Sequence, residues 1–585
     1  MHTVAKRWIG PCVATDAPLV ERVLAARGVA GHAAAALLNP SLRQLRDPAA
    51  LPGLEAAAQR LLEAIRQQQR IVVYGDYDVD GVAASAILIR IMRALDPHVR
   101  VQSYIPHRED EGYGLSAQAL RSIAEEGADL IVTVDCGVTA AKEAQLARSL
   151  GLDLIITDHH TPPAAIEDLP AAVAVVHPSL PGAHQQHPEL TGAGVALKLA
   201  WRLATLHTGS ERVAPPLREL LVDLLALAAM GTIADVAPLV EDNWLIARFG
   251  LSRLRTERFV GLRALVEASG LAKQTIDETS VGFRLAPRLN AVGRLGHARE
   301  ALELLLTDDP RRAAELAETL CTLNEQRRSM ERDIFEQAME QAERQGMTDE
   351  STGAVVLADE RWRTGIVGIV CARIVETLRK PCLLLRREGD LLRGSGRSVE
   401  GFNLHAALQR CSDHLLSFGG HAMAAGLSLA TENFHRFVDD FQRCARELLQ
   451  GVDRRPAVRI DTAASIEELT LAQTRTLLGL GPFGPAHPRP TLLLSNASLA
   501  APPRRMGKQG AHLLLQTTQP GVSGALRVVG WRMGELAPRL ALAERYDLVL
   551  TPTINRFNGR TSVEGELLDV RPTTRSATQP ALTGS

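Results

Sequence analysis

Three aspartates stand at alternate positions directly after an apolar run. Asp76, Asp78 and Asp80 follow Ile71-Val72-Val73-Tyr74-Gly75 and precede Gly81. Carboxylates this close together repel one another, and a divalent cation with oxygen ligands is the simplest agent that relieves the repulsion. A solvated acidic turn, with Asp-Gly as ordinary turn chemistry, explains the same residues equally well. The stretch alone therefore leaves a metal site and a plain turn open.

Two later apolar runs also end on polar chemistry. Residues 131–134 lead into Asp135-Cys136-Gly137, and residues 154–157 lead into Asp158-His159-His160. A histidine pair after one strand is more often a hydrogen-bonded turn, but the coincidence of seven candidate ligands at three strand ends favours a metal site. Mixed Asp and His ligands without Cys predict Mn²⁺ or Mg²⁺.

The elements that must position these side chains alternate between strand and helix. The pattern predicts a strand over 71–74, a helix over 82–95, and then strands and helices over 101–105, 117–126, 130–134, 140–150 and 154–157. Such alternation is typical of an α/β fold with a mostly parallel, doubly wound sheet. The carboxyl ends of its strands meet at one edge, where ligands bind.

Composition describes an ordinary globular protein of several domains. The 585 residues are 46% hydrophobic and 23% charged, with a net charge of −2. No apolar run is long enough for a membrane span, and the first residues lack a secretion signal, so we expect a cytoplasmic protein. Seven cysteines without a Cys-x-x-Cys pair fit a reducing compartment and small buried packing roles.

The motifs together resemble a known superfamily. Residues 75–81, 134–137 and 158–160 are similar to the strand-end motifs of the DHH phosphoesterase superfamily. Further motifs at 177–178, 190–196, 230–236 and 288–295 resemble the bacterial single-strand-specific exonuclease family RecJ, from about residue 70 to the end. Several unrelated motifs in one order make this resemblance specific.

The resemblance implies roles for individual residues. Two metal ions, Mn²⁺ or Mg²⁺, would be held by Asp78, Asp80, Asp135, His159 and Asp235, with Asp135 bridging them. Asp76 and Asp158 would be catalytic carboxylates beside the ions, and His160 would face the scissile phosphate. From local sequence alone Asp235 is better explained as a cap of the preceding apolar helix. Tyr74 stands where related pyrophosphatases carry a metal-binding His, which weakens a pyrophosphatase interpretation.

Two glycine-rich segments resemble a DHHA1 substrate-binding domain. Arg393-Gly394-Ser395-Gly396-Arg397-Ser398 and Gly419-Gly420-His421 let backbone N–H groups approach an anion, although ligand-free glycine turns are common. On the resemblance, Ser395, Arg397 and His421 contact substrate, and Asn290 and Arg294 lie near the cleft.

The domain order that we predict combines these patterns. It consists of a helical segment over 1–70, the DHH catalytic domain over 71–308, a connecting helix over 309–350, the DHHA1 domain over 351–451, an OB-fold single-strand-binding domain over 452–572 and a disordered tail over 573–585. Five short strands over 491–494, 512–516, 526–531, 547–554 and 565–570 suit the OB-type barrel. After residue 453, roughly sixteen basic against nine acidic side chains favour contact with phosphate groups. The aromatic side chains available to stack on bases are Trp531, Tyr546 and Phe557.

The function implied by the resemblance is single-stranded-DNA-specific 5′→3′ exonuclease activity. Two-metal phosphodiester hydrolysis would release 5′-mononucleotides during DNA recombination and in mismatch or base-excision repair. A single-strand DNA-binding protein and a RecQ-type helicase are implied as partners, and we expect a monomer. Two alternatives stay open: another DHH phosphodiesterase that acts on short oligonucleotides or cyclic dinucleotides, and a non-catalytic DNA-binding scaffold.

Overall fold

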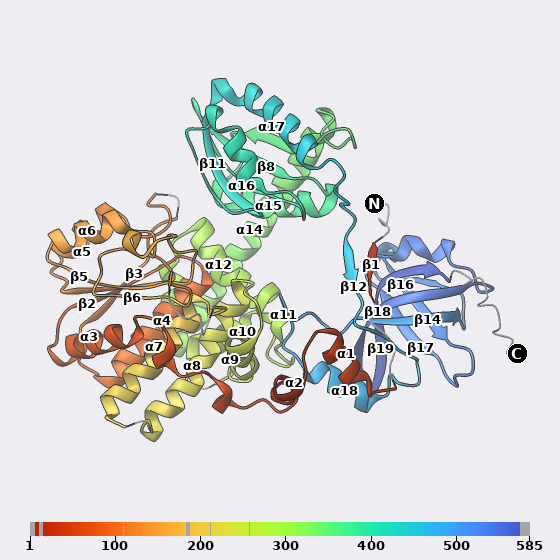
Figure 1. Ribbon diagram of the computed structural model, residues 1–585, viewed down its shortest axis with the longest axis horizontal. Coiled ribbons are helices and arrows are strands. Elements are labelled where there is room, and N and C mark those ends of the chain that lie inside the picture. Colours follow the sequence, from red (N-terminus) through yellow and green to blue (C-terminus); the bar gives the residue numbers. More distant parts are fainter. Residues whose placement is uncertain are drawn as a thin grey trace, which may run out of the picture. The chain divides into compact units, whose positions relative to one another are not determined.

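The computed structural model describes residues 6–10, 16–108, 110–182, 188–210, 212–256 and 258–573. They form two compact units, one of residues 45–454 and one that joins residues up to 44 with those from 455 onward (Figure 1). The segment predicted as one helical piece over 1–70 is therefore divided between the units, and it contains a strand, β1 (Arg7–Ile9). Except for Thr573, the tail predicted to be disordered lies outside the described residues.

A parallel sheet forms the base of the central unit, as predicted. Its five strands run in the order β3-β2-β4-β5-β6 with parallel pairing throughout. The strands are β2 (Ile71–Gly75), β3 (Val101–Tyr104), β4 (Leu130–Val134), β5 (Asp153–Thr157) and β6 (Ala174–Val176). The chain leaves β2 toward β3 on one side and returns to β4 on the other. This reversal creates a topological switch point between the carboxyl ends of β2 and β4, where open α/β sheets bind ligands.

Helices cover both faces of this sheet (Figure 1). Alternate strand residues such as Val72 and Ile131 share a core with α5 (Ala117–Glu125) and α6 (Ala141–Ser149). The opposite face carries α3 (Leu54–Arg66), α4 (Val79–Leu95) and α7 (Gly192–Thr208). The apolar side chains on both sides explain why the strands read as continuous hydrophobic runs.

After α7 the chain forms a layer of helices. Its elements are α8 (Pro215–Ala234), α9 (Glu241–Leu251), α10 (Val260–Ala268), α11 (Glu278–Ser280), a π-helical turn (Val281–Leu285), α12 (Ala286–Leu295) and α13 (Arg299–Leu306). The 35-residue helix α14 (Pro310–Arg344) packs on α10 and α12 at its start. Its last turns join a second core through Ile334, Ala338 and Ala342. The helix predicted as a connector thus contributes to two cores.

A second sheet completes the central unit. Its strand order is β10-β11-β9-β8-β7, with β7 and β8 parallel and the other pairs antiparallel. The strands are β7 (Val355–Asp359), β8 (Cys382–Glu388), β9 (Leu391–Arg397), β10 (Ser417–Gly420) and β11 (Ala424–Ala430). Helices α14 and α15 (Thr364–Leu378) cover one face, and α16 (Leu404–Arg410) and α17 (Phe434–Leu448) cover the other.

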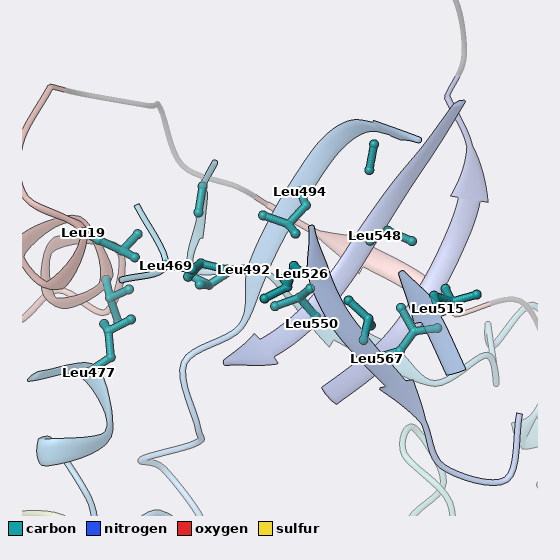
Figure 2. Close-up of a cluster of buried hydrophobic side chains, with 14 of the residues drawn as sticks. Leu19, Leu469, Leu477, Leu492, Leu494, Leu515, Leu526, Leu548, Leu550 and Leu567 are labelled. Carbon is teal, nitrogen blue, oxygen red and sulfur yellow. The ribbon is translucent and has the colours of Figure 1, made fainter. Parts of the chain in front are cut away.

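The other unit is built on a closed barrel. Its strands are β13 (Thr462–Ala463), β14 (Leu492–Leu499), β15 (Arg504–Met506), β16 (His512–Thr518), β17 (Leu526–Gly530), β18 (Arg545–Phe557) and β19 (Arg560–Pro572). The order β14-β18-β19-β17-β16 returns to its start because β16 also pairs with β14. Leucines from these strands fill the interior (Figure 2). The five predicted strands are all present, and closure gives the OB-type barrel.

Residues near the amino terminus complete this unit. Helices α1 (Leu19–Ala26) and α18 (Leu471–Gly479) extend the core through Leu19 and Leu477 (Figure 2), and α2 (Gly31–Leu38) follows α1. β1 pairs in parallel with β12 (Ala457–Arg459). Arg27 forms an ion pair with Asp461 at 2.8 Å. Among the described residues of both units, no helix has the length and hydropathy needed to cross a bilayer.

The barrel corrects one expectation about aromatic side chains. Tyr546, predicted to be available to a nucleic acid, is 1% exposed and lies in the barrel core. Its position on β18 points inward because strand residues alternate between the two faces. Trp531 and Phe557 are exposed, as predicted.

Candidate metal centre

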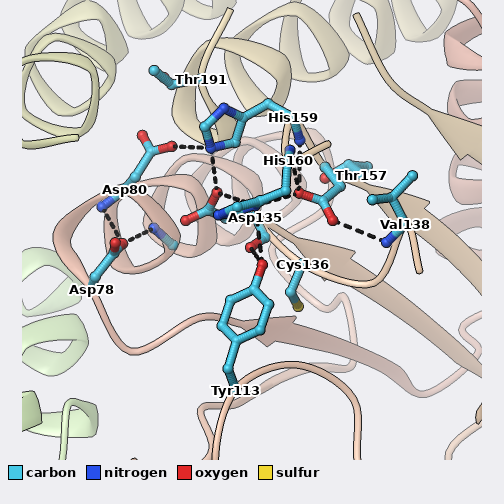
Figure 3. A network of polar contacts seen from close by, with 12 residues as sticks. Asp78, Asp80, Tyr113, Asp135, Cys136, Val138, Thr157, His159, His160 and Thr191 are labelled. Atoms are coloured by element: carbon cyan, nitrogen blue, oxygen red, sulfur yellow. Dashed lines mark hydrogen bonds and ion pairs between the residues drawn. The ribbon is translucent and has the colours of Figure 1, made fainter. Parts of the chain in front are cut away.

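The three strand ends bring the predicted acidic and histidine side chains together at one edge of the parallel sheet (Figure 3). Ligand atoms lie within 4.8 Å of one another in each of three groups: Asp76, Asp78 and Asp135; Asp80, His159 and Asp235; and Asp135, His159 and His160. Asp135 and His159 each belong to two groups. This sharing suits two adjacent ions with Asp135 between them.

Helix amino termini position two of the carboxylates. Asp78 caps α4, and its Oδ1 accepts N–H bonds from Asp80 at 2.9 Å and Gly81 at 3.1 Å. Helix α4 thus begins at Val79, three residues before the predicted start, because Asp78 is an N-cap where a turn was expected. Asp80 Oδ1 accepts the N–H of Ala193 in the first turn of α7 at 3.1 Å. Both helix dipoles favour negative charge here.

Two glycines leave space for the carboxylates. A Cβ at Gly231 would lie 2.3 Å from Asp80 Oδ1, and a Cβ at Gly192 would lie 2.7 Å from Asp135 Oδ1. Both distances are far below a van der Waals contact. Only a glycine allows α7 and α8 to pack this closely against the acidic edge. The sequence motifs contain both glycines, but their spacing did not reveal this role.

Asp135 is held in an unusual backbone conformation. Its φ of 63° is in the left-handed region, which Asp and Asn adopt more readily than other non-glycine residues. Its Oδ1 lies 3.0 Å from His159 Nε2, and His159 Nε2 lies 3.8 Å from Asp80 Oδ2 (Figure 3). Backbone strain of this kind clusters at ligand sites, where the surrounding structure over-determines the conformation.

Buried polar atoms without well-aligned hydrogen bonds converge on this edge. They are Asp76 Oδ1, Asp80 Oδ2, Asp135 Oδ1 and His159 Nε2. Leaving one such group unsatisfied costs about 1–3 kcal/mol, more when it is charged. The donor set consists of oxygen and imidazole nitrogen, which suits Mn²⁺ or Mg²⁺. Divalent ions therefore fit the residues present.

The electrostatics of the chain by itself reflect the same crowding. Burial, and then the charge of Asp78, raise the pKa of Asp76 to about 8 and that of Asp235 to about 7. Burial also raises the pKa of Asp80 and Asp135 well above the usual range. It lowers the pKa of His159 to about 4, which keeps the imidazole neutral. A neutral imidazole is the form that binds metals.

Asp158 has a different environment from the other carboxylates. Its Oδ1 accepts the N–H of His159 at 2.7 Å and both the N–H and ring Nδ1–H of His160, and its Oδ2 accepts the N–H of Val138 at 2.9 Å. Burial alone would raise the pKa of Asp158, but these bonds hold it at about 2. Burial lowers the pKa of His160, but the hydrogen bond to the Asp158 carboxylate and its charge raise it by more, to about 9. Asp158 thus orients a positively charged His160.

The residues predicted on α12 lie between this edge and the second sheet. Asn290 Oδ1 accepts the N–H of Val79 at 3.2 Å, beside the cap of α4. Arg294 donates from Nη1 to the carbonyl of Gly365 at 2.7 Å, at the start of α15. Burial, followed by the neighbouring guanidinium groups of Arg108, Arg327 and Arg397, lowers the pKa of Arg294 to about 9. Arginines gathered in this way form an electropositive site that suits an anion.

Ser395, Arg397 and His421 lie together in the second sheet. Ser395 and Arg397 are two residues apart on β9 and therefore share a face. His421 is in the turn between β10 and β11, where its N–H bonds to the carbonyl of Ala424, the partner of Arg397 in the ladder. Arg397 extends this group toward Arg294. Ser395 pairs within the second sheet and its carbonyl accepts from Cys371 of α15, and the contact described for His421 stays within the sheet.

Sequence reasoning missed Tyr113. Its hydroxyl lies 3.0 Å from His160 Nδ1 and donates to the carbonyl of Asp135 at 3.3 Å (Figure 3). Gly112 and Gly114 on either side both have positive φ. An aromatic residue between two glycines in a polar loop is the only signal in the sequence, and it does not indicate which side chain the tyrosine contacts.

Comparison with protein families covers both units. Residues 70–232 match the DHH family N-terminal domain, residues 351–447 match the DHHA1 domain, and residues 460–569 match the RecJ OB domain. These three matches follow the order predicted for the catalytic, substrate-binding and OB-type regions.

Individual relatives extend the match over nearly the whole chain. The single-stranded-DNA-specific exonuclease RecJ of Bacillus subtilis is 39% identical over 93% of this chain, which spans 66% of that relative's length. The Dickeya dadantii protein of the same name is 35% identical over 96% of this chain and 98% of its own. The crystal structure of Thermus thermophilus RecJ in complex with Mn²⁺ superposes with a TM-score of 0.78 at 34% identity, covering 97% of this chain and 79% of that one. The chain therefore belongs to the RecJ family.

Proposed function

We propose that this protein is a metal-dependent exonuclease that degrades single-stranded DNA from its 5′ end and releases 5′-mononucleotides. The observation that carries the proposal is the set of buried polar atoms without hydrogen-bond partners in the described part of the chain, on Asp76, Asp80, Asp135 and His159, at one sheet edge. Relatives named single-stranded-DNA-specific exonucleases, and Thermus RecJ structures in complex with Mn²⁺ and Mg²⁺, support it.

The metal ligands in this proposal are five side chains: Asp78, Asp80, Asp135, His159 and Asp235. Their grouping supports two ions, Mn²⁺ or Mg²⁺, that share Asp135. When bound, such ions withdraw charge from the scissile phosphate and lower the pKa of an attacking water. His159 contributes a neutral imidazole, and the glycines at 192 and 231 keep the carboxylates close to α7 and α8.

Three further residues act on the substrate side of the centre. His160 is protonated at neutral pH, and its Nδ1–H is engaged by Asp158, so its Nε2–H is left to donate to a phosphate oxygen. Asp158 fixes this orientation with its own hydrogen bonds. Asp76 Oδ1 has no partner among the described residues and can accept a proton from the attacking water.

Basic and glycine-rich residues would hold the strand end. Arg294 and Arg397 supply guanidinium groups that suit phosphate, and Ser395 and His421 add neighbouring donors on the second sheet. Asn290 steadies the start of α4 beside the ligands. A phosphate-holding group on one side of the metal centre supports cleavage at a strand end, and hence exonuclease activity.

The barrel unit supports a single-strand substrate. Trp531 is 52% exposed and contacts the ring of His512 at 4.9 Å between centroids. Exposed basic side chains occur on the same strands and loops: Arg504, Arg505, Lys508 and Arg532. Stacking on an exposed ring combined with phosphate contacts is the usual way in which such barrels hold one strand. A cyclic dinucleotide would not need this surface.

The cellular setting is proposed on family membership. We infer a cytoplasmic enzyme of DNA recombination and of mismatch or base-excision repair, which acts with a single-strand DNA-binding protein and a RecQ-type helicase. A monomer is sufficient, because one chain carries the metal ligands, the arginine group and the barrel.

Degradation of an end-labelled strand tests the function. The strand carries its label at the 5′ or the 3′ end and is incubated with Mn²⁺, Mg²⁺ or chelator. We expect immediate release of the 5′ label as a mononucleotide and late release of the 3′ label, both abolished by chelator. Asp135→Asn should be inactive, while Asp168→Asn, at an exposed position in the turn Ile166–Asp168 before β6, should match the wild type.

Each alternative gives a distinct result. Early release of the 3′ label would reverse the proposed polarity. Faster turnover of a dinucleotide than of a long strand would point to a phosphodiesterase for short substrates. Tight binding of the strand without turnover in either metal would point to a scaffold.

A further inference from the structure

We propose that Tyr113 is a positioning residue whose hydroxyl holds His160 and the backbone of Asp135 in one arrangement, and that Tyr74 is the buried anchor which places it. The inference rests on the proposed hydrolytic function of the centre. It adds two tyrosines to that function, neither of which is itself a candidate metal ligand.

The hydroxyl of Tyr113 joins two parts of the centre that belong to different strand ends. It lies 3.0 Å from Nδ1 of His160, after β5, and donates to the carbonyl of Asp135, after β4, at 3.3 Å. The rings of Tyr113 and His160 meet edge to face with centroids 5.4 Å apart. One oxygen atom therefore contacts both strand ends (Figure 3).

The donors and acceptors around this hydroxyl are mutually consistent. Asp158 Oδ1 is an acceptor 2.8 Å from His160 Nδ1, so Nδ1 carries the proton. The Tyr113 oxygen then accepts from the same Nδ1–H, and its own O–H is directed to the Asp135 carbonyl. Both contacts constrain His160 to present Nε2 on the far side of the ring. The contact to Asp135 also supports a residue with a φ of 63°.

Tyr74 anchors the loop that carries Tyr113. It is fully buried at the end of β2, and its hydroxyl donates to the carbonyl of Gly114 at 2.9 Å. Its ring stacks on that of Tyr104 at 5.0 Å, and Tyr104 in turn donates to Glu111 Oε2 at 2.6 Å in the same loop. Gly112 and Gly114 both have positive φ. Because glycine restricts the backbone less than any other residue, these two positions do not make the loop rigid. The buried hydroxyl of Tyr74 supplies the fixed point next to Tyr113.

The experiment removes each hydroxyl without removing its ring. Tyr113→Phe, Tyr74→Phe and the double variant are compared with the wild type for kcat and KM on a single-stranded substrate in Mg²⁺. Tyr546→Phe is the matched control, because it removes a tyrosine hydroxyl from the barrel core of the other unit. Asp135→Asn gives the background rate.

We expect Tyr113→Phe to lower kcat about tenfold with KM within about twofold, since a misplaced catalytic group costs chemistry more than binding. Tyr74→Phe should lower kcat about fivefold. Because Tyr74 acts through Tyr113, the double variant should lose about tenfold and not the fiftyfold that independent effects would give. Tyr546→Phe should match the wild type.

Ring-nitrogen NMR of ¹⁵N-histidine-labelled protein gives a readout that is independent of activity. The His160 signals are assigned by their loss in His160→Gln, in metal-free and Mg²⁺-loaded protein. Tyr113→Phe should shift the Nδ1 resonance of His160, and Tyr74→Phe should shift it in the same direction.

Separate outcomes overturn each part. An unchanged kcat or an unmoved His160 resonance in Tyr113→Phe removes Tyr113 from the proposal, and a rise in KM alone would make it a substrate contact. A fiftyfold loss in the double variant removes Tyr74 as the anchor. A wild type without metal-dependent turnover would refute the exonuclease, while the NMR shifts would still decide the hydrogen-bond arrangement.

Discussion

Two buried aspartates of the central unit have the same side chain and the same burial but opposite surroundings. Asp135 and Asp242 are each 1% exposed. Asp242 forms an ion pair with Lys198 at 2.7 Å, and Lys198 is itself 1% exposed. Asp135 is surrounded by Asp76, Asp78, Asp80 and Asp158, and the basic groups beside it are the neutral imidazole of His159 and the protonated imidazole of His160.

The comparison separates stability from function. The charge of Asp242 is balanced within the chain by Lys198 on α7, so this buried carboxylate needs no ligand. Asp135 faces the first turn of the same helix, where Gly192 leaves space, and none of the described lysine or arginine side chains forms an ion pair with it. Buried charges that the chain does not neutralise itself are expected at sites that bind something else.

The largest effect should come from Asp135→Asn. Loss of a shared ligand should reduce the exonuclease rate by about a thousandfold or more. The metal-free variant should nevertheless be about 1–2 kcal/mol more stable than the wild type, because the amide is neutral without the proton that the buried carboxyl must bind. Exonuclease assays and urea unfolding of chelated protein measure both quantities. A less stable metal-free variant would contradict our account of the cluster.

The same substitution at the other site should have the opposite sign. Asp242→Asn leaves Lys198 buried without its partner and should destabilise the protein by about 3–5 kcal/mol. The exonuclease rate for each folded molecule should not change. Unfolding midpoints, together with rates measured below the transition, test this. Equal stability changes for the two Asp→Asn variants would end the distinction between the sites.

Metal addition should stabilise only the protein with an intact cluster. At about 100 times the dissociation constant, binding to the native state adds about 2.7 kcal/mol. Wild type and Asp242→Asn should both show this gain with Mn²⁺ or Mg²⁺ by calorimetry, and Asp135→Asn should lose most of it. A gain that survives in Asp135→Asn would locate the ions elsewhere.

A smaller effect should appear in the pH dependence of the metal-free protein. Unfolded aspartates titrate near 3.9, whereas the pKa is raised to about 8 at Asp76 and about 7 at Asp235. The folded state therefore keeps protons that the unfolded state has lost, and stability should fall by about 1–2 kcal/mol between pH 6.5 and 8. His160, with its pKa raised to about 9, contributes in the same direction.

Urea unfolding in chelator at several pH values measures this slope. Saturating Mg²⁺ should reverse it, because ions bind the deprotonated carboxylates. The slope should be unchanged in Asp242→Asn and shallower in Asp135→Asn. A stability that rises with pH in chelator would contradict the predicted proton uptake.

Local sequence predicted most of the secondary structure. The apolar runs at Ile71–Gly75 and Leu130–Val134 form strands because helices bury them on both faces, and the second of these strands has the predicted bounds. The start of α4 was missed because Asp78 and Gly81 are typical of both a turn and a helix cap. Division of the first residues between units was not predictable, since β1 pairs with β12 at the other end of the chain.

The site was predictable only in part. Strand-end positions brought Asp76, Asp135 and Asp158 to one edge, which follows from parallel topology. Their roles, and those of the substrate-side residues, stay predictions. Tyr113 and the glycines at 192 and 231 act through contacts between elements that are not adjacent in the sequence. Neither spacing nor composition carries that information.

The barrel unit has a consequence for the order of synthesis. Leu19, Val23 and Leu24 leave the ribosome early, but the strands that cover them, from β14 to β19, are made last. The central unit can fold during that interval, because its residues are contiguous. A chain interrupted after Arg454 would present the apolar side of α1 without its cover. Incomplete chains should therefore be recognised by chaperones and proteases through their first helix, although the defect lies at the other end of the protein.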